Sequence, residues 1–363
     1  MKAIILAGGI GTRLRPLSCT RPKLLFPVLN KPLLDRTLER LAESGVTELV
    51  LAVKHMAGTL MQRYGSSSHG IKILYSKEKV PMRTGGAIKY AEELIGHEEP
   101  FLVLNGDIFT TIDYKKIIKQ HEESNATATI ALYRVEDPSR YGTVKLTENN
   151  RITQFVEKAP KDKAPSNLIN AGIYVLDPQT FNYIPAGRPV SIEHEVFPKL
   201  ATEGKLSGYL FEDIWVDIGK TEDFLRANRV MLDTQTGKLI AGKDTNLDKV
   251  TVNVPVCIHT GVDVGKGTTV GPYTVIGKDV SIGKNVHIEN TVVFPDATIS
   301  DNVTIKGSVI GEGATIGKGA TVSEGCVIGD YTTIKDNIHL SRNVTVCHSK
   351  EVTEHAPPDK QII

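Results

Sequence analysis

The sequence predicts an α/β protein in two parts: a mixed, mostly parallel Rossmann-like domain, followed by a parallel β-helix. Strand-like and helix-like segments alternate along residues 1–235, an order that is typical of parallel sheets covered by helices. In residues 251–350, Val, Ile and Thr fill 41 of 100 positions and leucine occurs once, which favours β-structure throughout. These two patterns predict the fold class.

The first part begins with an apolar strand, Lys2–Ala7. An amphipathic helix follows at 32–44, with Pro32 in its first turn and Gly45 as its stop. Thr221 is the expected N-cap of a last helix that ends at Leu232. The later strands are separated by fewer residues along the chain, so we expect the sheet to become mixed, with both parallel and antiparallel strands. The expected strands are 48–53, 72–75, 101–104, 127–133, 152–156, 169–176 and 206–211, and the other expected helices are 84–94 and 114–123.

A six-residue repeat identifies the type of β-structure in the second part. This period fits three short faces per turn of a parallel β-helix, with one inward aliphatic side chain per face and small residues at the corners. Glycine follows the aliphatic residue in seven repeats. The aliphatic positions are Ile258, Val264, Val270, Ile276, Ile282, Ile288, Val293, Ile299, Ile305, Ile310, Ile316, Val322, Ile328, Ile334, Leu340 and Val346.

Hexapeptide coils of this kind resemble the left-handed β-helix family. We therefore expect a catalytic domain at 1–235, a left-handed β-helix at 251–350 and a C-terminal tail at 351–363 that leaves the coil. Residues 236–250 carry no clear apolar period and are the expected linker. The flat faces and open ends of such a coil favour symmetric assembly, so a homo-oligomer through this domain is expected.

Composition narrows the class of protein. Lys and Arg number 43 and Asp and Glu 42, so the net charge of +1 argues against a nucleic-acid partner. No apolar run approaches the ~20 residues of a membrane span, and the first residues are expected to be a buried strand instead of a signal peptide. The four cysteines are scattered, which favours reduced thiols in a cytoplasmic protein.

A glycine-rich loop follows the first strand. Gly8, Gly9 and Gly11 would let backbone N–H groups approach phosphate oxygens, although a tight strand-to-helix turn would also use them. The dinucleotide fingerprint fails because Leu14 occupies its third glycine position, and no Walker A Gly-Lys-Ser/Thr is present. Four cations next to the loop indicate a polyphosphate site: Arg13, Arg15, Arg21 and Lys23.

The run from Leu6 to Lys23 strongly resembles the signature of the sugar-1-phosphate nucleotidylyltransferases. The resemblance spans nearly the whole chain, and the segments Ser191–Pro198 and Pro357–Ile363 are similar to the GDP-mannose pyrophosphorylase branch of the family. Other matching segments are Asn105-Gly106-Asp107, Tyr141-Gly142, 155–158, 170–174 and 215–219.

The resemblance implies transfer of a nucleoside monophosphate from an NTP to a sugar 1-phosphate, with release of pyrophosphate. The nucleophile is a phosphate oxygen that is already ionised, so positioning and electrostatics supply the rate. Asp107 and Asp217 are implied to hold Mg²⁺, Arg13 the leaving pyrophosphate and Lys23 the α-phosphate. The implied nucleotide-binding residues also include Leu6, Ala7, Gly8, Gly9, Gly11, Thr12, Glu78, Arg83, Thr84 and Gly106, and those for the sugar phosphate are Gly142, Glu157, Lys158, Asn170, Gly172 and Asp217.

Glu78 bears on the choice of base. It lies where relatives that use uridine or thymidine commonly carry Gln. Guanine presents N1–H and N2–H₂ on one edge, and an ionised carboxylate can accept both. The residue therefore favours GTP. Mannose 1-phosphate is the acceptor that the resemblance implies, since no residue here distinguishes mannose from glucose.

Three alternatives stay open. UTP or dTTP with glucose 1-phosphate is the other substrate pair. A non-catalytic regulatory paralogue would be expected to lack Arg13, Lys23, Asp107 or Asp217, and all four are present. A second, acyl-transfer activity in the β-helix would need a histidine base, for which the candidates are His259, His287, His339 and His348.

Overall fold

The computed structural model describes residues 1–235, 238–242 and 244–363. The chain divides into two compact units. Residues 1–10 and 34–215 form the first, which we call the sheet unit. Residues 11–33 and 216–363 form the second, the coil unit. The segment 11–33 carries all four cations named next to the glycine loop, and it forms one compact unit with the C-terminal part of the chain.

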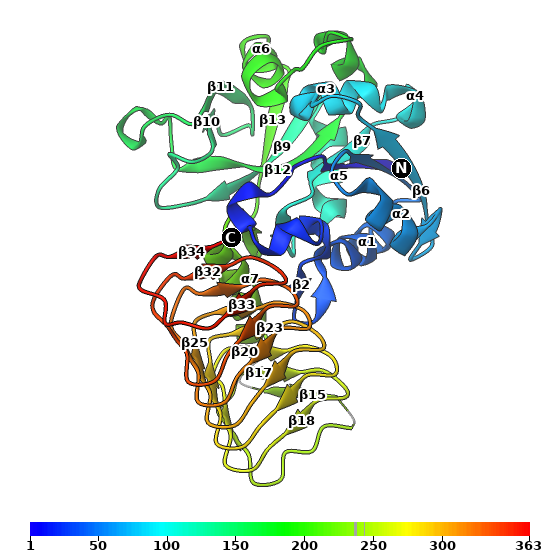
Figure 1. Ribbon diagram of the computed structural model, residues 1–363. Coiled ribbons are helices and arrows are strands. Elements are labelled where there is room, and N and C mark those ends of the chain that lie inside the picture. The colour runs from blue at the N-terminus through cyan, green and yellow to red at the C-terminus, as the bar shows by residue number, and fades with distance from the viewer. Residues whose placement is uncertain (236–237, 243) are drawn as a thin grey trace. The chain divides into compact units, whose positions relative to one another are not determined.

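The sheet unit is built on a mixed sheet with helices packed around it (Figure 1). Its strands run in the order β11-β10-β12-β7-β1-β4-β6-β5, and β9 pairs with β12 and β13. The strands are β1 Lys2–Ala7, β4 Glu48–Val53, β5 Ser67–Ser68, β6 Ile71–Lys77, β7 Phe101–Asn105, β9 Ala128–Arg134, β10 Gly142–Leu146, β11 Ile152–Glu157, β12 Leu168–Leu176 and β13 Leu206–Leu210, with a short β8 at Ile108–Thr110. The helices are α1 Leu33–Glu43, α2 Ala57–Tyr64, α3 Arg83–Tyr90, α4 Glu92–Ile95, α5 Tyr114–Ser124 and α6 Phe197–Thr202.

Four neighbouring strands of this sheet, β7, β1, β4 and β6, are parallel. In register, Leu6 of β1 lies beside Asn105 of β7 on one side and Ala52 of β4 on the other. The later strands β10, β11 and β12 pair antiparallel. The predicted mixed, mostly parallel sheet is thus confirmed, and its parallel strands end at one common edge.

The coil unit contains a parallel β-helix built from three all-parallel sheets, seen in Figure 1 as a stack of coils. One sheet has the order β15-β17-β20-β23-β26-β29-β32-β34, and the other two have six strands each. Strands stack at equivalent repeat positions, as where Ile316 lies between Ile299 and Ile334. This architecture confirms the predicted hexapeptide β-helix. Its strands are β15 Leu239–Ala241, β16 Thr251–Val252, β17 Val256–Ile258, β18 Asp263–Val264, β19 Thr269–Val270, β20 Thr274–Ile276, β21 Ser281–Ile282, β22 His287–Glu289, β23 Val292–Val293, β24 Thr298–Ile299, β25 Thr304–Lys306, β26 Val309–Ile310, β27 Thr315–Ile316, β28 Thr321–Val322, β29 Val327–Ile328, β30 Thr333–Ile334, β31 His339–Leu340, β32 Thr345–Val346, β33 Glu351–Val352 and β34 Gln361–Ile362.

The limits of the coil differ from those predicted. Residues 239–241, assigned to the linker, form β15 and pair with β17, while residues 236, 237 and 243 of that linker lie outside the described ranges. The tail does not leave the coil, because β33 and β34 join its sheets. The reason is that Val352 continues the six-residue step from Val346 and is buried in the same core.

The glycines that follow the aliphatic positions lie directly after the short strands, at the predicted corners, and the backbone of the next coil lies close to them. A Cβ on Gly265 would lie 2.5 Å from the backbone of Gly283, and one on Gly277 would lie 2.6 Å from Pro295 N. Close stacking of adjacent coils therefore requires them. Many of the left-handed turns are made by asparagine and aspartate, such as Asn285 and Asp296, whose short polar side chains tolerate positive φ.

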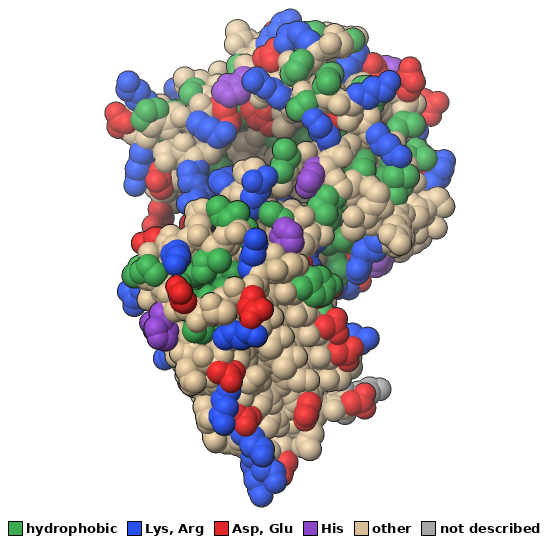
Figure 2. All heavy atoms as spheres, viewed as in Figure 1, with side chains coloured by type: hydrophobic (Ala, Val, Ile, Leu, Met, Phe, Trp, Pro, Cys, Tyr) green, Lys and Arg blue, Asp and Glu red, His purple; other side chains and the backbone are tan. Residues whose placement is uncertain are grey.

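Segment 11–33 and helix α7 (Thr221–Asp233) also belong to the coil unit. The segment contains three short 3₁₀ turns, Thr12–Leu14, Leu17–Cys19 and Lys23–Leu25, and the two-stranded ribbon of β2 Pro27–Val28 and β3 Lys31–Pro32. Helix α7 begins at Thr221 with Lys220 as its N-cap, one residue before the predicted cap. On the face seen in Figure 2, the coils carry scattered acidic and basic side chains on a largely uncharged surface.

Replacing Ile316 by alanine is expected to lower the free energy of unfolding by about 2–4 kcal/mol, because the side chain is fully buried in the stack and its removal leaves a cavity. The matched control is Thr315→Ala, on the same strand but only partly buried, which should change stability by less than about 0.5 kcal/mol. Urea denaturation followed by circular dichroism measures both variants. Equal stability of the two variants would contradict the placement of the Ile316 side chain inside the β-helix.

Candidate active site

The carboxyl ends of the parallel strands place three predicted residues at one edge of the sheet unit. Gly8 follows β1, Glu78 follows β6 and Asp107 follows β7. The turn after β7 is fixed by the Gly106 N–H, which donates to the Leu6 carbonyl at 3.0 Å. Ligands of open α/β sheets bind outside this edge, so the topology explains why residues so far apart in sequence can serve one site.

The Glu78 carboxylate lies beside the glycine loop. Its Oε1 would be 3.5 Å from a Cβ on Gly8, and its Oε2 accepts a hydrogen bond from the Met82 N–H at 3.0 Å. Partial burial raises the pKa of Glu78, while the Met82 N–H and the charge of Lys54 oppose that shift. One carboxylate oxygen is therefore fixed by backbone, and the group sits in a less polar environment than a surface glutamate.

A second cavity of the sheet unit, about 400 Å³ in volume, collects charged and hydroxyl side chains. One of its lining residues, Glu157, pairs with Gly142 across β10 and β11. A Cβ on Gly142 would lie 2.6 Å from Glu157 Oε2 and 2.6 Å from the Phe155 ring, so only glycine leaves room for the carboxylate. The cavity is lined by Arg83, Thr84, Glu157, Lys158, Ser191, Glu193 and His194.

Two carboxylates give this cavity its electrostatic character. Burial raises the pKa of Glu157, and the nearby charge of Glu193 raises it further, while Lys158 and His194 lower it. Glu193 Oε2 accepts hydrogen bonds from the hydroxyls of Thr84 and Ser191, both at 2.6 Å. The cavity thus offers fixed acceptors next to cations, a combination that suits a polyhydroxylated anion.

Asn170 and Gly172 shape the strand β12 behind this region. Asn170 Oδ1 accepts from the Gly172 N–H at 2.9 Å, and its Nδ2 donates to the Tyr174 hydroxyl at 3.0 Å. Gly172 has φ +74°, and a Cβ there would lie 2.7 Å from Asn105 Nδ2. The register of β12 against β9 shifts at this point. Both hydrogen bonds of Asn170 are local, so its predicted contact with the sugar stays a prediction.

The coil unit holds the other charged residues of the predicted site. Gly11 has φ +68°, and a Cβ there would lie 2.8 Å from Lys23 Cε, so the lysine side chain crosses the loop where the glycine leaves space. Arg13 and Asp217 meet beside Gly219, where a Cβ would lie 3.2 Å from Arg13 Nη2 and 3.4 Å from Asp217 Oδ1. A phosphate cation and a predicted metal ligand are therefore neighbours.

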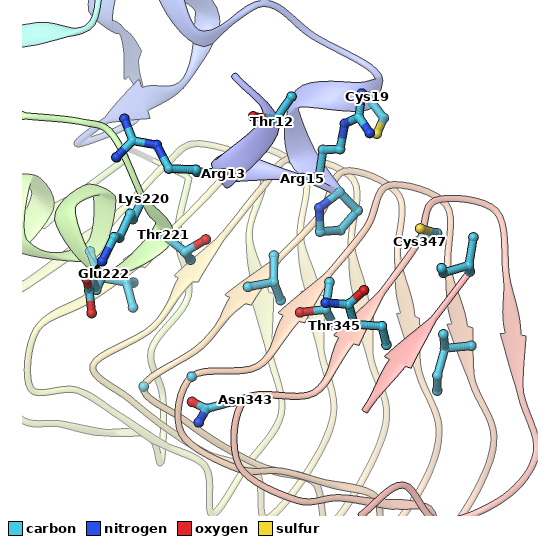
Figure 3. Close-up of a pocket in the computed structure, with 18 residues that line it drawn as sticks. Thr12, Arg13, Arg15, Cys19, Lys220, Thr221, Glu222, Asn343, Thr345 and Cys347 are labelled. Carbon is cyan, nitrogen blue, oxygen red and sulfur yellow. Dashed lines mark hydrogen bonds and ion pairs between the residues drawn. The ribbon is translucent and has the colours of Figure 1, made fainter. Parts of the chain in front are cut away.

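A large cavity of about 1030 Å³ opens beside this loop within the coil unit. Figure 3 shows Thr12, Arg13 and Arg15 on the loop side, Lys220 at the start of α7, and Asn343 and Thr345 on the wall of the β-helix. Arg21 does not serve the polyphosphate site indicated by the cation cluster. Its guanidinium pairs with Glu312 at 2.9 Å and Asp330 at 2.5 Å, so its charge is neutralised within the coil unit.

Comparison with known proteins identifies the family. Residues 2–234 match the model described as nucleotidyl transferase, and residues 252–363 match the GMPPB C-terminal domain. The chain belongs to the nucleotidyl transferase family. The family inferred from the Leu6–Lys23 motif is thereby confirmed.

Similar proteins include named sugar-nucleotide enzymes. A mannose-1-phosphate guanyltransferase from Aspergillus oryzae is 38% identical over 250 residues, covering 66% of this chain and 68% of the relative. The mannose-1-phosphate guanylyltransferase catalytic subunit beta from Danio rerio is 42% identical over 229 residues, covering 62% and 63%. The solved structure of HddC from Yersinia pseudotuberculosis complexed with GMP-PN has a TM-score of 0.54 and 29% identity, covering 63% of this chain and 99% of HddC.

Nucleotidyl transferases of this family use a divalent metal, and the donor set here fits one. Within the described residues, His, Cys, Asp and Glu side chains form no group of three or more able to hold an ion. The two predicted ligands are both aspartates, and a divalent ion held by few carboxylates completes its coordination with phosphate oxygens and water. Asp107 lies in the sheet unit and Asp217 in the coil unit, so their joint binding of one ion stays a prediction.

The structure also shows what sequence reasoning missed in this nucleotidyl transferase. It places Arg83 and Thr84, predicted as nucleotide-binding, in the same cavity as Glu157 and Lys158. Glu193 and His194 line that cavity and received no role, although the segment that contains them had been singled out by its resemblance. Of the remaining predicted residues, Leu6 and Ala7 lie in β1 and Gly9 follows it closely, whereas Thr12 begins the 3₁₀ turn Thr12–Leu14 of the coil unit.

Among the described residues, the candidate histidines for an acyl-transfer base either have partners close by in sequence or are exposed. His259 Nδ1 accepts from the Thr260 N–H at 2.8 Å, and His287 Nε2 lies 3.2 Å from Glu289 Oε2. His339 and His348 are exposed. None of the helices in the described ranges has both the length and the hydropathy that a membrane span requires.

Proposed function

We propose that the chain transfers GMP from GTP to mannose 1-phosphate and releases pyrophosphate. The observation that carries the base assignment is the Glu78 carboxylate beside Gly8, at the edge where the parallel strands end. An ionised carboxylate can accept from both N1–H and N2–H₂ of guanine. The names of the similar guanyltransferases and the GMP-PN in the HddC complex support the same choice.

In this proposal each group of residues has one task. The glycine loop and Lys23 hold the α-phosphate, and Arg13 holds the pyrophosphate that leaves. Lys158 holds the phosphate of the acceptor, whose oxygen attacks the α-phosphorus opposite the leaving group. Glu157 and Glu193 accept hydrogen bonds from sugar hydroxyls, and Gly142 lets the ring approach the backbone. The nucleophile is ionised before it binds, so no general base is required.

Asp107 and Asp217 are proposed to hold Mg²⁺. The ion, when bound, would neutralise charge on the triphosphate and on the leaving pyrophosphate. The role of the chain is to hold these two carboxylates, and the Arg13 cation that lies beside Asp217, next to the place where phosphate oxygens would arrive. Assembly into a homo-oligomer through the β-helix and a cytoplasmic location stay predictions.

The test is a pyrophosphate-release assay that crosses GTP, UTP, dTTP, ATP and CTP with mannose, glucose and N-acetylglucosamine 1-phosphates. We expect GTP with mannose 1-phosphate to give the highest kcat/KM. Preference for UTP or dTTP with glucose 1-phosphate would establish the alternative substrate pair. No turnover with any pair would favour a regulatory paralogue, in spite of the presence of Arg13, Lys23, Asp107 and Asp217.

A further inference from the structure

One carboxylate of the β-helix is almost completely buried against segment 11–33. Asp330 lies in the turn between β29 (Val327–Ile328) and β30 (Thr333–Ile334), and it is 1% exposed. Its Oδ2 accepts from the Thr20 hydroxyl and from Arg21 Nη2, both at 2.5 Å. Its Oδ1 accepts from the Glu312 N–H at 2.8 Å. Both carboxylate oxygens of this buried side chain therefore accept hydrogen bonds.

Arg21 is held from several sides. Its Nη2 also contacts Glu312 Oε2 at 2.9 Å, its guanidinium lies 4.8 Å from the centre of the Phe294 ring, and its side chain is 15% exposed. A buried ion pair is costly unless hydrogen bonds satisfy it, and breaking it by removing one partner leaves an uncompensated charge. The geometry of the pair therefore restricts the position of the loop backbone at Thr20 and Arg21.

The other end of the same loop is also fixed to the coil unit. The Leu29 N–H donates to Asn228 Oδ1 at 2.9 Å, and Asn30 Nδ2 donates to the Ile276 carbonyl at 2.8 Å. Between the two ends, Phe26 packs edge-to-face against Phe224 and Phe294. Lys23 lies between these anchors.

We propose that Asp330 is a positioning residue: through Arg21 it fixes the Thr20–Lys23 segment, so that the β-helix determines where the Lys23 ammonium lies. This inference rests on the proposed function, because it takes Lys23 as a ligand of the α-phosphate. It assigns the C-terminal domain a part in transfer that is separate from any role in assembly. Asp330 touches no substrate in this account and acts only through Arg21.

Asp330→Asn tests the proposal, because it removes the negative charge while the side-chain volume stays nearly the same. A displacement of about 1 Å in a reacting group can cost on the order of 10²-fold in rate. We expect a ten- to hundred-fold loss of kcat with GTP and mannose 1-phosphate, together with faster hydrogen–deuterium exchange in peptides that cover residues 20–26. The matched control is Asp336→Asn, six residues on, where Asp336 Oδ1 accepts the Lys318 N–H at 2.8 Å but the side chain is exposed. The control should keep the wild-type kcat and exchange.

A second pair of variants separates positioning from loss of stability. Arg21→Met should lower both Tm and kcat, because it leaves Asp330 buried without its cation. Adding Asp330→Asn to Arg21→Met removes that charge, so Tm should recover while kcat stays low. If kcat recovers together with Tm, or if Asp330→Asn keeps wild-type kcat and exchange, the proposal is overturned. If the wild type transfers no nucleotide, the proposed function fails instead, and the exchange of residues 20–26 still decides whether Asp330 holds the loop.

Discussion

Asp107→Asn is expected to lower kcat for nucleotidyl transfer by about three orders of magnitude, equivalent to about 4 kcal/mol of transition-state stabilisation. The residue follows β7 in a turn whose backbone is held by the Gly106–Leu6 hydrogen bond, and asparagine has almost the same shape. The fold should therefore be kept while one anionic metal ligand is lost. The assay is pyrophosphate release at saturating GTP and mannose 1-phosphate over a range of Mg²⁺ concentrations.

The dependence of the rate on Mg²⁺ concentration tests whether Asp107 is a metal ligand. If Asp107 holds the ion, the variant should need more Mg²⁺ for half-maximal rate. Asp217→Asn should lower kcat and raise the required Mg²⁺ concentration in the same way. The double variant should have a kcat only slightly below that of either single variant, because residues that hold one ion act as a unit. Asp113→Asn is the matched control, since Asp113 caps α5 through the Lys115 N–H at 3.0 Å. Normal turnover of Asp107→Asn, or strictly additive effects with Asp217→Asn, would refute the shared metal site.

Periodic features of the fold could be predicted from sequence because they depend on local pattern. The strand Glu48–Val53 lies where the alternation of strand-like and helix-like segments predicts it. The hexapeptide repeat likewise predicts the β-helix and the side chains that its core buries. The limits of the coil were missed where the repeat weakens. At the C-terminal end, Val352 keeps the period but polar neighbours and the Pro357-Pro358 pair obscure it.

Contacts between remote segments could not be predicted in the same way. The cations after Gly11 form one cluster in sequence, yet Arg21 pairs with Asp330, 309 residues away, while Arg13 lies beside Asp217. Charge spacing identifies a basic segment but does not show which carboxylates another segment will bring to it. The role of Glu193 was hidden for the same reason, since its orientation depends on the hydroxyl of Thr84, 109 residues earlier.

Glu78→Gln is expected to lower kcat/KM for GTP by about ten- to a hundred-fold and to raise relative activity with UTP. The expectation follows from hydrogen bonding: an amide presents one acceptor oxygen and one donor, so one guanine N–H would face another donor or stay unpaired, at about 1–3 kcal/mol. Uracil offers one N–H beside acceptors and suits the amide. Initial rates with GTP and UTP measure the switch. Glu48→Gln, at an exposed ion pair with Lys72, is the matched control.

The pH dependence gives an independent check on the same residue. Burial raises the pKa of Glu78, and guanine requires its ionised form. As pH falls towards this raised pKa, the protonated fraction grows, so KM for GTP should rise at a higher pH than an ordinary glutamate would cause. Glu78→Gln carries no titrating group there, and its KM for GTP should be high and flat over the same range. A wild-type KM that does not change, or a variant that keeps full preference for GTP, would show that another residue reads the base.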